Sequence, residues 1–220
     1  MSFGSIAIGV RIWANVRAEF FRSYSDLLME GLRDGDAVLP PAVRLPHSCA
    51  CNFLAESFFQ SECDSILFLD DDMDFRPSDL DVMRDTGEYD ILSGLCVSRR
   101  GQKPVMHLLD KEAKEFSVDP NGVCPCDVAG LAFTLVKRRV FDALGYHNIF
   151  RWDNVMGEDG AFCCDAKAKG FSVGVHTGVS VGHVMDVTVR HDVETGKNKY
   201  RFEDFGVKKM LRRNNDKMKG

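Results

Sequence analysis

The feature that most constrains this chain is a short apolar run that ends in a cluster of carboxylates. Residues 66–69, Ile-Leu-Phe-Leu, have the length and composition of a buried central strand. Four carboxylates follow within five residues, namely Asp70, Asp71, Asp72 and Asp74. Their mutual repulsion grows as the local dielectric constant falls, so the cluster requires protonation, full exposure to water or a bound cation.

Asp70 and Asp72 have the spacing of a pair of metal ligands. In an extended chain, residues two apart project to the same side. Two carboxylates so placed are hard oxygen ligands for Mg²⁺ or Mn²⁺, with water and substrate phosphates completing the coordination shell. A solvated acidic turn is the alternative interpretation of the same residues.

Composition places the chain among ordinary globular proteins. Its 220 residues are enough for one domain with a sizeable core, and 45% of them are hydrophobic. No run approaches the roughly 18 apolar residues that span a bilayer. The first five residues lack the basic start and apolar stretch of a signal peptide. We therefore expect a cytoplasmic protein without a transmembrane segment, whose eight cysteines are reduced and mostly buried structural thiols.

Charge is distributed unevenly along the chain, although the net charge is only −5. Residues 197–220 hold nine Lys and Arg against three Asp and Glu. We expect one domain over residues 1–190 and a basic extension over 191–220, partly helical and packed on or trailing from the domain. The extension is either a solvated tail or a surface for an anionic acceptor, membrane or diphosphate.

Hydrophobic periodicity predicts the order of strands and helices. The predicted strands are 6–10, 37–45, 66–69, 90–92, 128–136, 171–175 and 179–184, with a further hairpin formed by 105–109 and 115–118. The predicted helices are 18–32, 48–60, 77–86, 138–144 and 159–169. Pro40 and Pro41 restrict the second strand to a sheet edge. Alternation early and mixed strands later predict an α/β fold, a single-domain, Rossmann-like three-layer sandwich with a mixed central sheet.

Two further positions carry residue types that suit metal or acid–base chemistry. Glu158 and Asp159 open a predicted helix, where acidic residues also cap free N–H groups and complement the helix dipole. His183 ends the last apolar strand, and a neutral imidazole is a ligand for Mn²⁺. Ligands gather at the carboxyl ends of strands in α/β sheets, so Asp70, Asp72 and His183 can converge there. Each position taken alone also has a purely structural interpretation.

Taken together and in order, these motifs resemble those of the GT-A glycosyltransferases, especially the nucleotide-sugar-dependent, family-2-like transferases of bacteria, phages and large viruses. The similar segments look like the strand with its D-x-D metal motif, the strand and helix beside the acceptor, the E-D element of the catalytic helix, and the return strand with its terminal histidine. They are residues 66–77, 127–141, 157–163, 170–171 and 181–183. If the protein is encoded by a virus or phage, we expect it in the cytoplasm of the host cell.

The resemblance implies transfer of a sugar from a nucleoside diphosphate sugar, UDP- or GDP-linked, to a hydroxyl of a glycan, lipid or protein. It implies that Asp72, with Asp70 and His183, holds Mn²⁺ or Mg²⁺. Such an ion neutralises the charge that develops on the departing diphosphate. Contacts to the donor are expected from Asp70, Asp71, Asn52 and Arg99.

The resemblance also assigns the acid–base chemistry. Asp159 is expected to accept the proton of the acceptor hydroxyl, with Glu158 as the second choice, and a positioned base contributes about 10²–10⁴-fold. One base suffices for direct displacement, so inversion at the anomeric carbon is expected. Trp152 offers an apolar face to an acceptor sugar or packs in the core. The chain departs from its relatives at Cys51-Asn52, where an Arg-Asn pair is expected, so the usual arginine contact is missing there.

Two other functions remain open at this stage. The first is a non-catalytic nucleotide-sugar or glycan-binding module of the same fold, which the retention of Asp70, Asp72, Asp159 and His183 disfavours. The second is a haloacid-dehalogenase-like phosphotransferase, which also places D-x-D at a strand end. In that family the motif lies near the N-terminus and precedes an apolar-Thr/Val pattern, whereas residues 73–74 here are Met-Asp.

Overall fold

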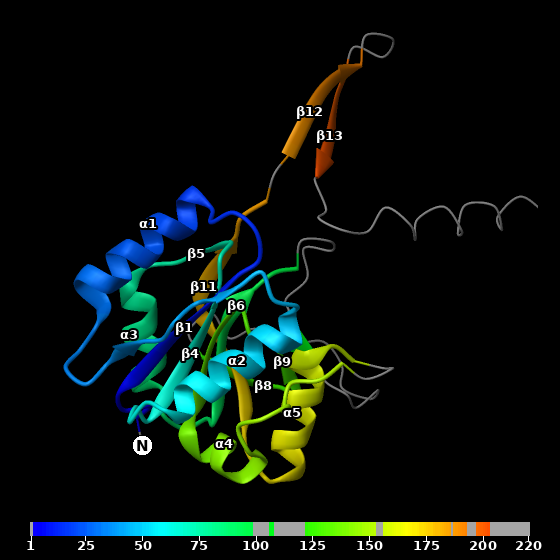
Figure 1. Ribbon diagram of the computed structural model, residues 1–220. Helices are drawn as coiled ribbons and strands as arrows, with labels where there is room; N and C mark the ends of the chain where they lie inside the picture. Colours follow the sequence, from blue (N-terminus) through cyan, green and yellow to red (C-terminus); the bar gives the residue numbers. More distant parts are fainter. Residues whose placement is uncertain are drawn as a thin grey trace, which may run out of the picture. The chain divides into compact units, whose positions relative to one another are not determined.

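The computed structural model describes residues 2–98, 106–107, 122–152, 156–185, 187–192 and 197–202. The chain divides into two compact units, Met1–Val184 and Met185–Gly220. In the first unit, a mixed sheet lies between two layers of helices (Figure 1). This arrangement confirms the predicted three-layer α/β sandwich.

Nine of the described strands form the central sheet of the first unit. One set is parallel, and consists of β1 (Ile6–Ile12), β2 (Ala37–Val38), β3 (Ala42–Val43), β4 (Ser65–Asp70), β6 (Ile91–Cys96) and β11 (Val173–His183). The others run antiparallel to their neighbours, and are β5 (Met73–Asp74), β8 (Val123–Pro125) and β10 (Phe133–Lys137). The order is β2-β1-β4-β10-β6-β11-β5, with β3 beside β1 and β8 beside β11.

Helices cover both faces of this sheet (Figure 1). One layer holds α1 (Ala18–Asp26), the π-helical turn η1 (Leu27–Gly31) and α3 (Pro77–Asp85). The other layer holds α2 (His47–Phe59), α4 (Arg138–Leu144) and α5 (Glu158–Ala168). These elements confirm the predicted helices to within a few residues at their ends. None of the described helices is long and apolar enough to cross a membrane.

The apolar run at 66–69 is buried on both of its faces. Ile66 and Phe68 pack in the hydrophobic cluster beneath α2, α4 and α5. Leu67 and Leu69 pack in the opposite cluster, beneath α1 and α3. A strand covered on both sides needs apolar residues at every position, which explains the continuous run. The prediction of a central strand with the carboxylates at its carboxyl end is confirmed.

The predicted strand 128–136 is interrupted. Its first part, β9 (Val128–Ala129), pairs with β7 (Met106–His107) in a separate ribbon, and only β10 joins the central sheet. The chain bends between them, where the Thr134 hydroxyl donates to the carbonyl oxygen of Gly130 at 2.6 Å. An apolar sequence does not reveal such a bend, because both parts are buried.

The two strands predicted at 171–175 and 179–184 are one strand, β11. Its pairing with β6 continues on both sides of an irregularity between His176 and Ser180. Strand β6 is likewise longer than the predicted 90–92 and contains Gly94 instead of ending before it. Both corrections have one cause, since each strand gains hydrogen bonds by extending along its neighbour.

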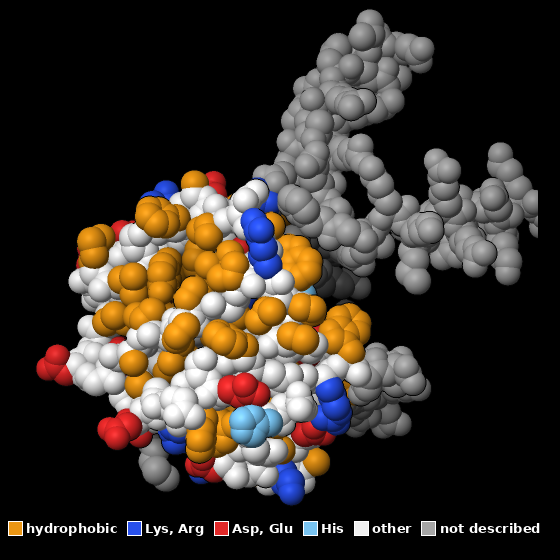
Figure 2. Space-filling model, in the orientation of Figure 1, with side chains coloured by type: hydrophobic (Ala, Val, Ile, Leu, Met, Phe, Trp, Pro, Cys, Tyr) orange, Lys and Arg blue, Asp and Glu red, His pale blue; other side chains and the backbone are white. Residues whose placement is uncertain are grey.

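The edge of the sheet beside β1 is formed by the short strands β2 and β3. The predicted single strand 37–45 is thus two short strands, because Pro40 and Pro41 between them have no N–H to donate to β1, while the predicted edge position is confirmed. Val38 and Val43 are about half exposed there, with relative accessibilities of 47% and 49%. Figure 2 shows further hydrophobic side chains in the part of the view where Figure 1 places α1. Short strands and proline protect such an edge from pairing with another chain.

The second unit contains an antiparallel pair, β12 (Val187–Asp192) and β13 (Lys197–Phe202). The expected basic extension 191–220 is therefore strand where it is described, and residues 203–220 lie outside the described residues. Its helical part, its role as an anionic contact and the boundary at residue 190 stay predictions. The hairpin predicted from 105–109 and 115–118 also lies outside the described residues, apart from 106–107.

Candidate functional site

Asp70, Asp72 and His183 lie at the end of the sheet where the carboxyl ends of the parallel strands meet. Strands β1, β4, β6 and β11 share one direction, because β10 is antiparallel to both β4 and β6. Arg11 pairs with Asp70 near the ends of β1 and β4, and His183 pairs with Met73 where β11 meets β5. The backbone N–H of Asp70 donates to the carbonyl of Ala132 at 3.0 Å, which brings the loop before β10 to the same end of the sheet.

Asp72 and His183 face each other at this end of the sheet. The Nε2 atom of His183 lies 3.5 Å from Oδ2 of Asp72. Its Nδ1 atom lies 2.9 Å from the carbonyl oxygen of Val97, which can only accept, so Nδ1 is the donor in this contact. Nε2 faces the Asp72 carboxylate, and with Nδ1 held by Val97 it is the ring nitrogen that a metal ion beside Asp72 would contact. The two side chains thus fit a divalent metal ion.

Asp70, the third predicted metal ligand, is paired with a cation of the protein itself. Its Oδ1 atom lies 2.7 Å from Nε of Arg11, as a charge contact without hydrogen-bond alignment. Among the described residues, no group of three or more His, Cys, Asp or Glu could hold a metal ion. Mg²⁺ and Mn²⁺ sites often use one or two protein ligands and substrate phosphates. Asp72 and His183 are two protein ligands of that kind, and metal binding by Asp72, His183 and Asp70 stays a prediction.

Arg11 is a site residue that the sequence reasoning missed. It is buried at the end of β1, and its two terminal nitrogens donate to Sγ of Cys51 at 2.9 Å and to the carbonyl of Leu131 at 3.1 Å. Burial is the largest single influence and lowers the pKa of Arg11, but the negative charges around it, led by Asp70 and including Asp159 and Glu158, together outweigh burial and raise the pKa. Arg11 therefore puts a guanidinium beside the cysteine that replaces the expected arginine. The signal in the sequence that could have identified Arg11 is its position as a single basic residue directly after the apolar run of strand 6–10.

Asp159, at the start of α5, has the environment of a general base. Its Oδ2 atom accepts the backbone N–H of Leu131 at 3.3 Å. Its Oδ1 atom is buried and has no hydrogen-bond partner among the described residues. Burial raises the pKa of Asp159 to about 7, helped by the charges of Glu158 and Asp70 and opposed by Arg11. A carboxyl group with this pKa can take and release a proton near neutral pH.

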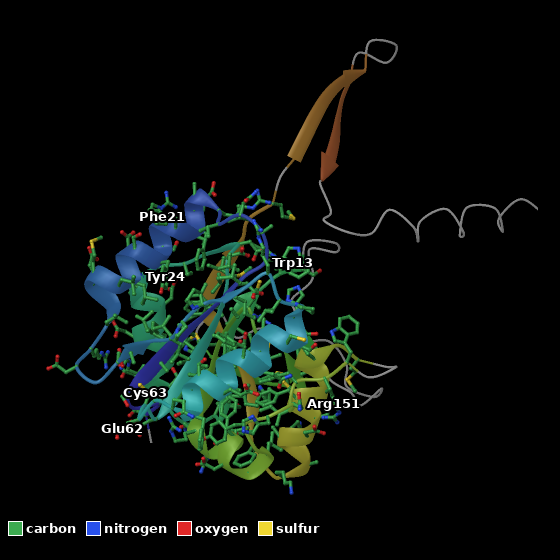
Figure 3. All side chains as sticks on the ribbon, in the orientation of Figure 1. Trp13, Phe21, Tyr24, Glu62, Cys63 and Arg151 are labelled. Carbon is green, nitrogen blue, oxygen red and sulfur yellow. The ribbon has the colours of Figure 1, made fainter. Side chains whose placement is uncertain are left out.

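Two exposed aromatic rings border the Glu158 side of the site. The buried Glu158 places Oε1 3.9 Å from Nδ1 of His47, whose ring stacks on Trp13 at 6.0 Å. Figure 3 places Trp13 toward the start of α2, and its side chain is 52% exposed. Trp152 is 69% exposed, and its ring would lie 3.9 Å from a Cβ at Gly157. Core packing of Trp152 is thereby excluded, and Trp13 is an addition to the predicted residues.

Two of the remaining residues predicted to contact the sugar donor, Asp71 and Asn52, form hydrogen bonds to loops around the site. Oδ2 of Asp71 accepts the backbone N–H of Trp13 at 3.0 Å, and burial raises the pKa of Asp71. The Asn52 amide donates to the carbonyl of Phe150 at 2.8 Å and accepts its N–H at 3.1 Å. Arg99 lies outside the described residues. Donor contacts by these three residues stay predictions.

Comparisons with known proteins give structural relatives only. No family model and no curated protein sequence matches the chain. The structure is similar to that of A197 from STIV, with a TM-score of 0.60, 16% identity, and coverage of 94% of this chain and 97% of that one. It is also similar to GalNAc-T7 solved with UDP, GalNAc and Mn²⁺, with a TM-score of 0.56 and 11% identity. That match covers 82% of this chain and 43% of GalNAc-T7, so the chain spans less than half of that protein.

At these identities the likeness concerns the fold. The chain has a GT-A-like, glycosyltransferase-type fold, in which a central mixed sheet carries helices on both faces. The fold class implied by the motifs is therefore confirmed. UDP, GalNAc and Mn²⁺ are ligands of the GalNAc-T7 structure.

Proposed function

We propose that this protein is a divalent-metal-dependent glycosyltransferase. It would transfer a sugar from a UDP- or GDP-linked donor to a hydroxyl of a glycan, lipid or protein, with inversion. One observation carries the proposal: the Asp72–His183 pair and the Asp159 carboxylate, whose Oδ1 atom is buried, lie at the same end of a GT-A-like sheet. A metal-binding pair and a base are the two functions that such a transfer needs.

On the donor side, Asp72 and His183 would hold Mn²⁺ or Mg²⁺ beside the diphosphate. When bound, the ion supplies positive charge to the departing diphosphate. The Val97 carbonyl orients the ring of His183, and the backbone N–H of Val184 donates to the carbonyl of Asp72 at 2.8 Å. These bonds fix both ligands before the donor arrives.

On the acceptor side, Asp159 would remove the proton of the attacking hydroxyl. The hydroxyl oxygen bonds to the anomeric carbon, the bond from that carbon to the diphosphate oxygen breaks, and the proton passes to Oδ1 of Asp159. Oδ1 suits this role because no protein donor among the described residues occupies it. The exposed faces of Trp13 and Trp152 would contact sugar rings through their apolar surface.

A binding module of the same fold is the second candidate. It is favoured by one observation, that Asp70 pairs with Arg11 instead of joining Asp72 and His183. The haloacid-dehalogenase-like alternative gains no support from the fold, since β10 runs antiparallel beside β4.

The test is a panel of UDP- and GDP-sugars with Mn²⁺, in which release of nucleoside diphosphate is followed. Asp72→Asn and Asp159→Asn should each lower the rate by at least about 10²-fold. Asp74→Asn and Asp165→Asn are matched controls, because their side chains are 45% and 37% exposed and bound to arginines. Both controls should keep the wild-type rate.

Turnover without metal, or unchanged turnover in Asp72→Asn and Asp159→Asn, would contradict the proposed mechanism. Binding of a nucleotide sugar without release in the presence of every acceptor would favour the binding module. Release of inorganic phosphate in place of nucleoside diphosphate would point to a phosphotransferase.

A further inference from the structure

Arg11 lies between the two halves of the site. Its Nε atom is 2.7 Å from Oδ1 of Asp70, and one terminal nitrogen donates to the carbonyl of Leu131 at 3.1 Å. The N–H of Leu131 in turn donates to Oδ2 of Asp159 at 3.3 Å. Contacts therefore run without a break from the D-x-D motif to the candidate base.

The charge balance of this region depends on Arg11. The guanidinium is buried, with a side-chain accessibility of 6%, and Asp70, Asp159 and Glu158 all act on its charge. Burial raises the pKa of Cys51 to about 12, so this thiol is neutral and is no counter-ion. The attraction of Arg11 is thus directed to the carboxylates on either side of it.

An arginine is specifically suited to this position. The planar guanidinium has five N–H donors, and here it contacts Asp70, Cys51 and Leu131 at once. A lysine ammonium keeps the charge but is a single point on a flexible stem, so it cannot reproduce three diverging contacts. Charge and geometry can therefore be separated by one substitution, Arg11→Lys.

We propose that Arg11 is a positioning residue of this site, holding Asp70 directly and Asp159 through the backbone of Leu131. It thereby sets the separation between the donor side and the acceptor side. The inference rests on the proposed glycosyl transfer, in which the D-x-D segment that carries Asp70 and Asp72 and the base Asp159 must meet one reacting centre. A misplacement of about 1 Å in such a site costs about 10²-fold in rate.

The first test needs no turnover. Unfolding midpoints are measured for Arg11→Lys, Asp159→Asn and the double variant of the full chain. The shift of the double variant should differ from the sum of the single shifts, because coupled residues are non-additive. Arg84→Lys is the matched control, since Arg84 is buried and paired with Asp36 beside the start of β1, and it should add independently to Asp159→Asn. Additive shifts for Arg11→Lys would overturn the inference.

The second test separates positioning from folding. With the nucleotide sugar from which the wild type releases nucleoside diphosphate fastest, Arg11→Lys should lower kcat by about 10²-fold and leave the donor KM within about threefold. Arg11→Met should also have a lower kcat than the wild type. The double variant Arg11→Met/Cys51→Arg should have a kcat at least about tenfold higher than Arg11→Met, because Cys51→Arg returns a guanidinium to the same space from α2.

Wild-type kcat in Arg11→Lys would overturn the positioning role and leave the proposed function intact. If the wild type turns over no nucleotide sugar, the proposed function fails instead. The coupling of Arg11 to Asp159 is then decided by the unfolding cycle alone.

Discussion

At the scale of single residues, Asp159 owes its properties to its surroundings. The helix start places it among Glu158, Asp70 and Arg11, and burial has the largest effect on its pKa. In an unfolded chain an aspartate titrates near about 3.9. The folded protein thus binds a proton that the unfolded chain has already lost across the window from about pH 4 to about pH 7.

This difference makes stability depend on pH. Because the folded state holds more protons in that window, the contribution of Asp159 to stability is present below about pH 4 and is lost as the pH rises to about 7. Asp159→Asn should remove this dependence and be more stable than the wild type at pH 8, by about 1 kcal/mol or more, which is about 2–4 °C in Tm. Thermal unfolding at pH 4 and pH 8 measures it.

Asp165→Asn, on the same helix, serves as the control and should retain the wild-type dependence on pH. The proposed transferase activity should show the opposite trend to stability, rising as the pH passes about 7, because only ionised Asp159 accepts a proton. A flat activity profile between pH 6 and pH 8 would exclude Asp159 as the base.

At the scale of elements, close contact between β6 and β11 positions His183. Gly94 of β6 permits this contact, since a Cβ there would lie 2.9 Å from Cγ2 of Val181 and 3.1 Å from Cδ1 of Phe133. Strand β11 continues from Val181 to His183, so its distance from β6 also places the imidazole. The glycine is required by packing rather than by backbone conformation.

Gly94→Ala should therefore destabilise the fold. The added methyl group has no free space, and overpacking of a core costs about 1–3 kcal/mol. Urea unfolding should show a lower midpoint with an unchanged slope, because the surface exposed on unfolding is the same. An unaltered midpoint would mean that β6 and β11 are farther apart than described.

At the scale of the whole molecule, the exposure of the eight cysteines indicates how well the core excludes solvent. All eight lie within the described residues and are free thiols. Cys49 is exposed, Cys164 is partly exposed, and the other six are buried. The prediction that most of the thiols are buried is confirmed for six of the eight, while their reduced state in the cell and structural role stay predictions. Burial raises the pKa of Cys126 to about 12, which further lowers its reactivity.

Thiol labelling tests this arrangement. In the native protein one thiol, Cys49, should react rapidly with an aromatic disulfide reagent and Cys164 more slowly. The other six should react only after unfolding in denaturant. Cys49→Ser is the control and should remove the rapid phase. Rapid reaction of several thiols in the native state would contradict the described core.

Much of the fold was predictable because periodicity and local propensity are properties of neighbouring residues. The run 66–69 has the length and composition of a strand buried on both faces, and α1 to α5 were recognisable from their apolar spacing. Strand ends were less predictable. The bend after Ala129 and the continuity of β11 depend on hydrogen bonds to distant strands, which local patterns do not encode.

The sequence by itself determined the fold class and the order in which acidic residues and a histidine reach the ends of strands. Only the tertiary structure decided which of them meet. It set His183 against Asp72, paired Asp70 with Arg11, and left one oxygen of Asp159 without a protein donor among the described residues. The physical reason is that such contacts join residues far apart in the chain and depend on ångström-scale packing, whereas sequence patterns specify only the local course of the backbone.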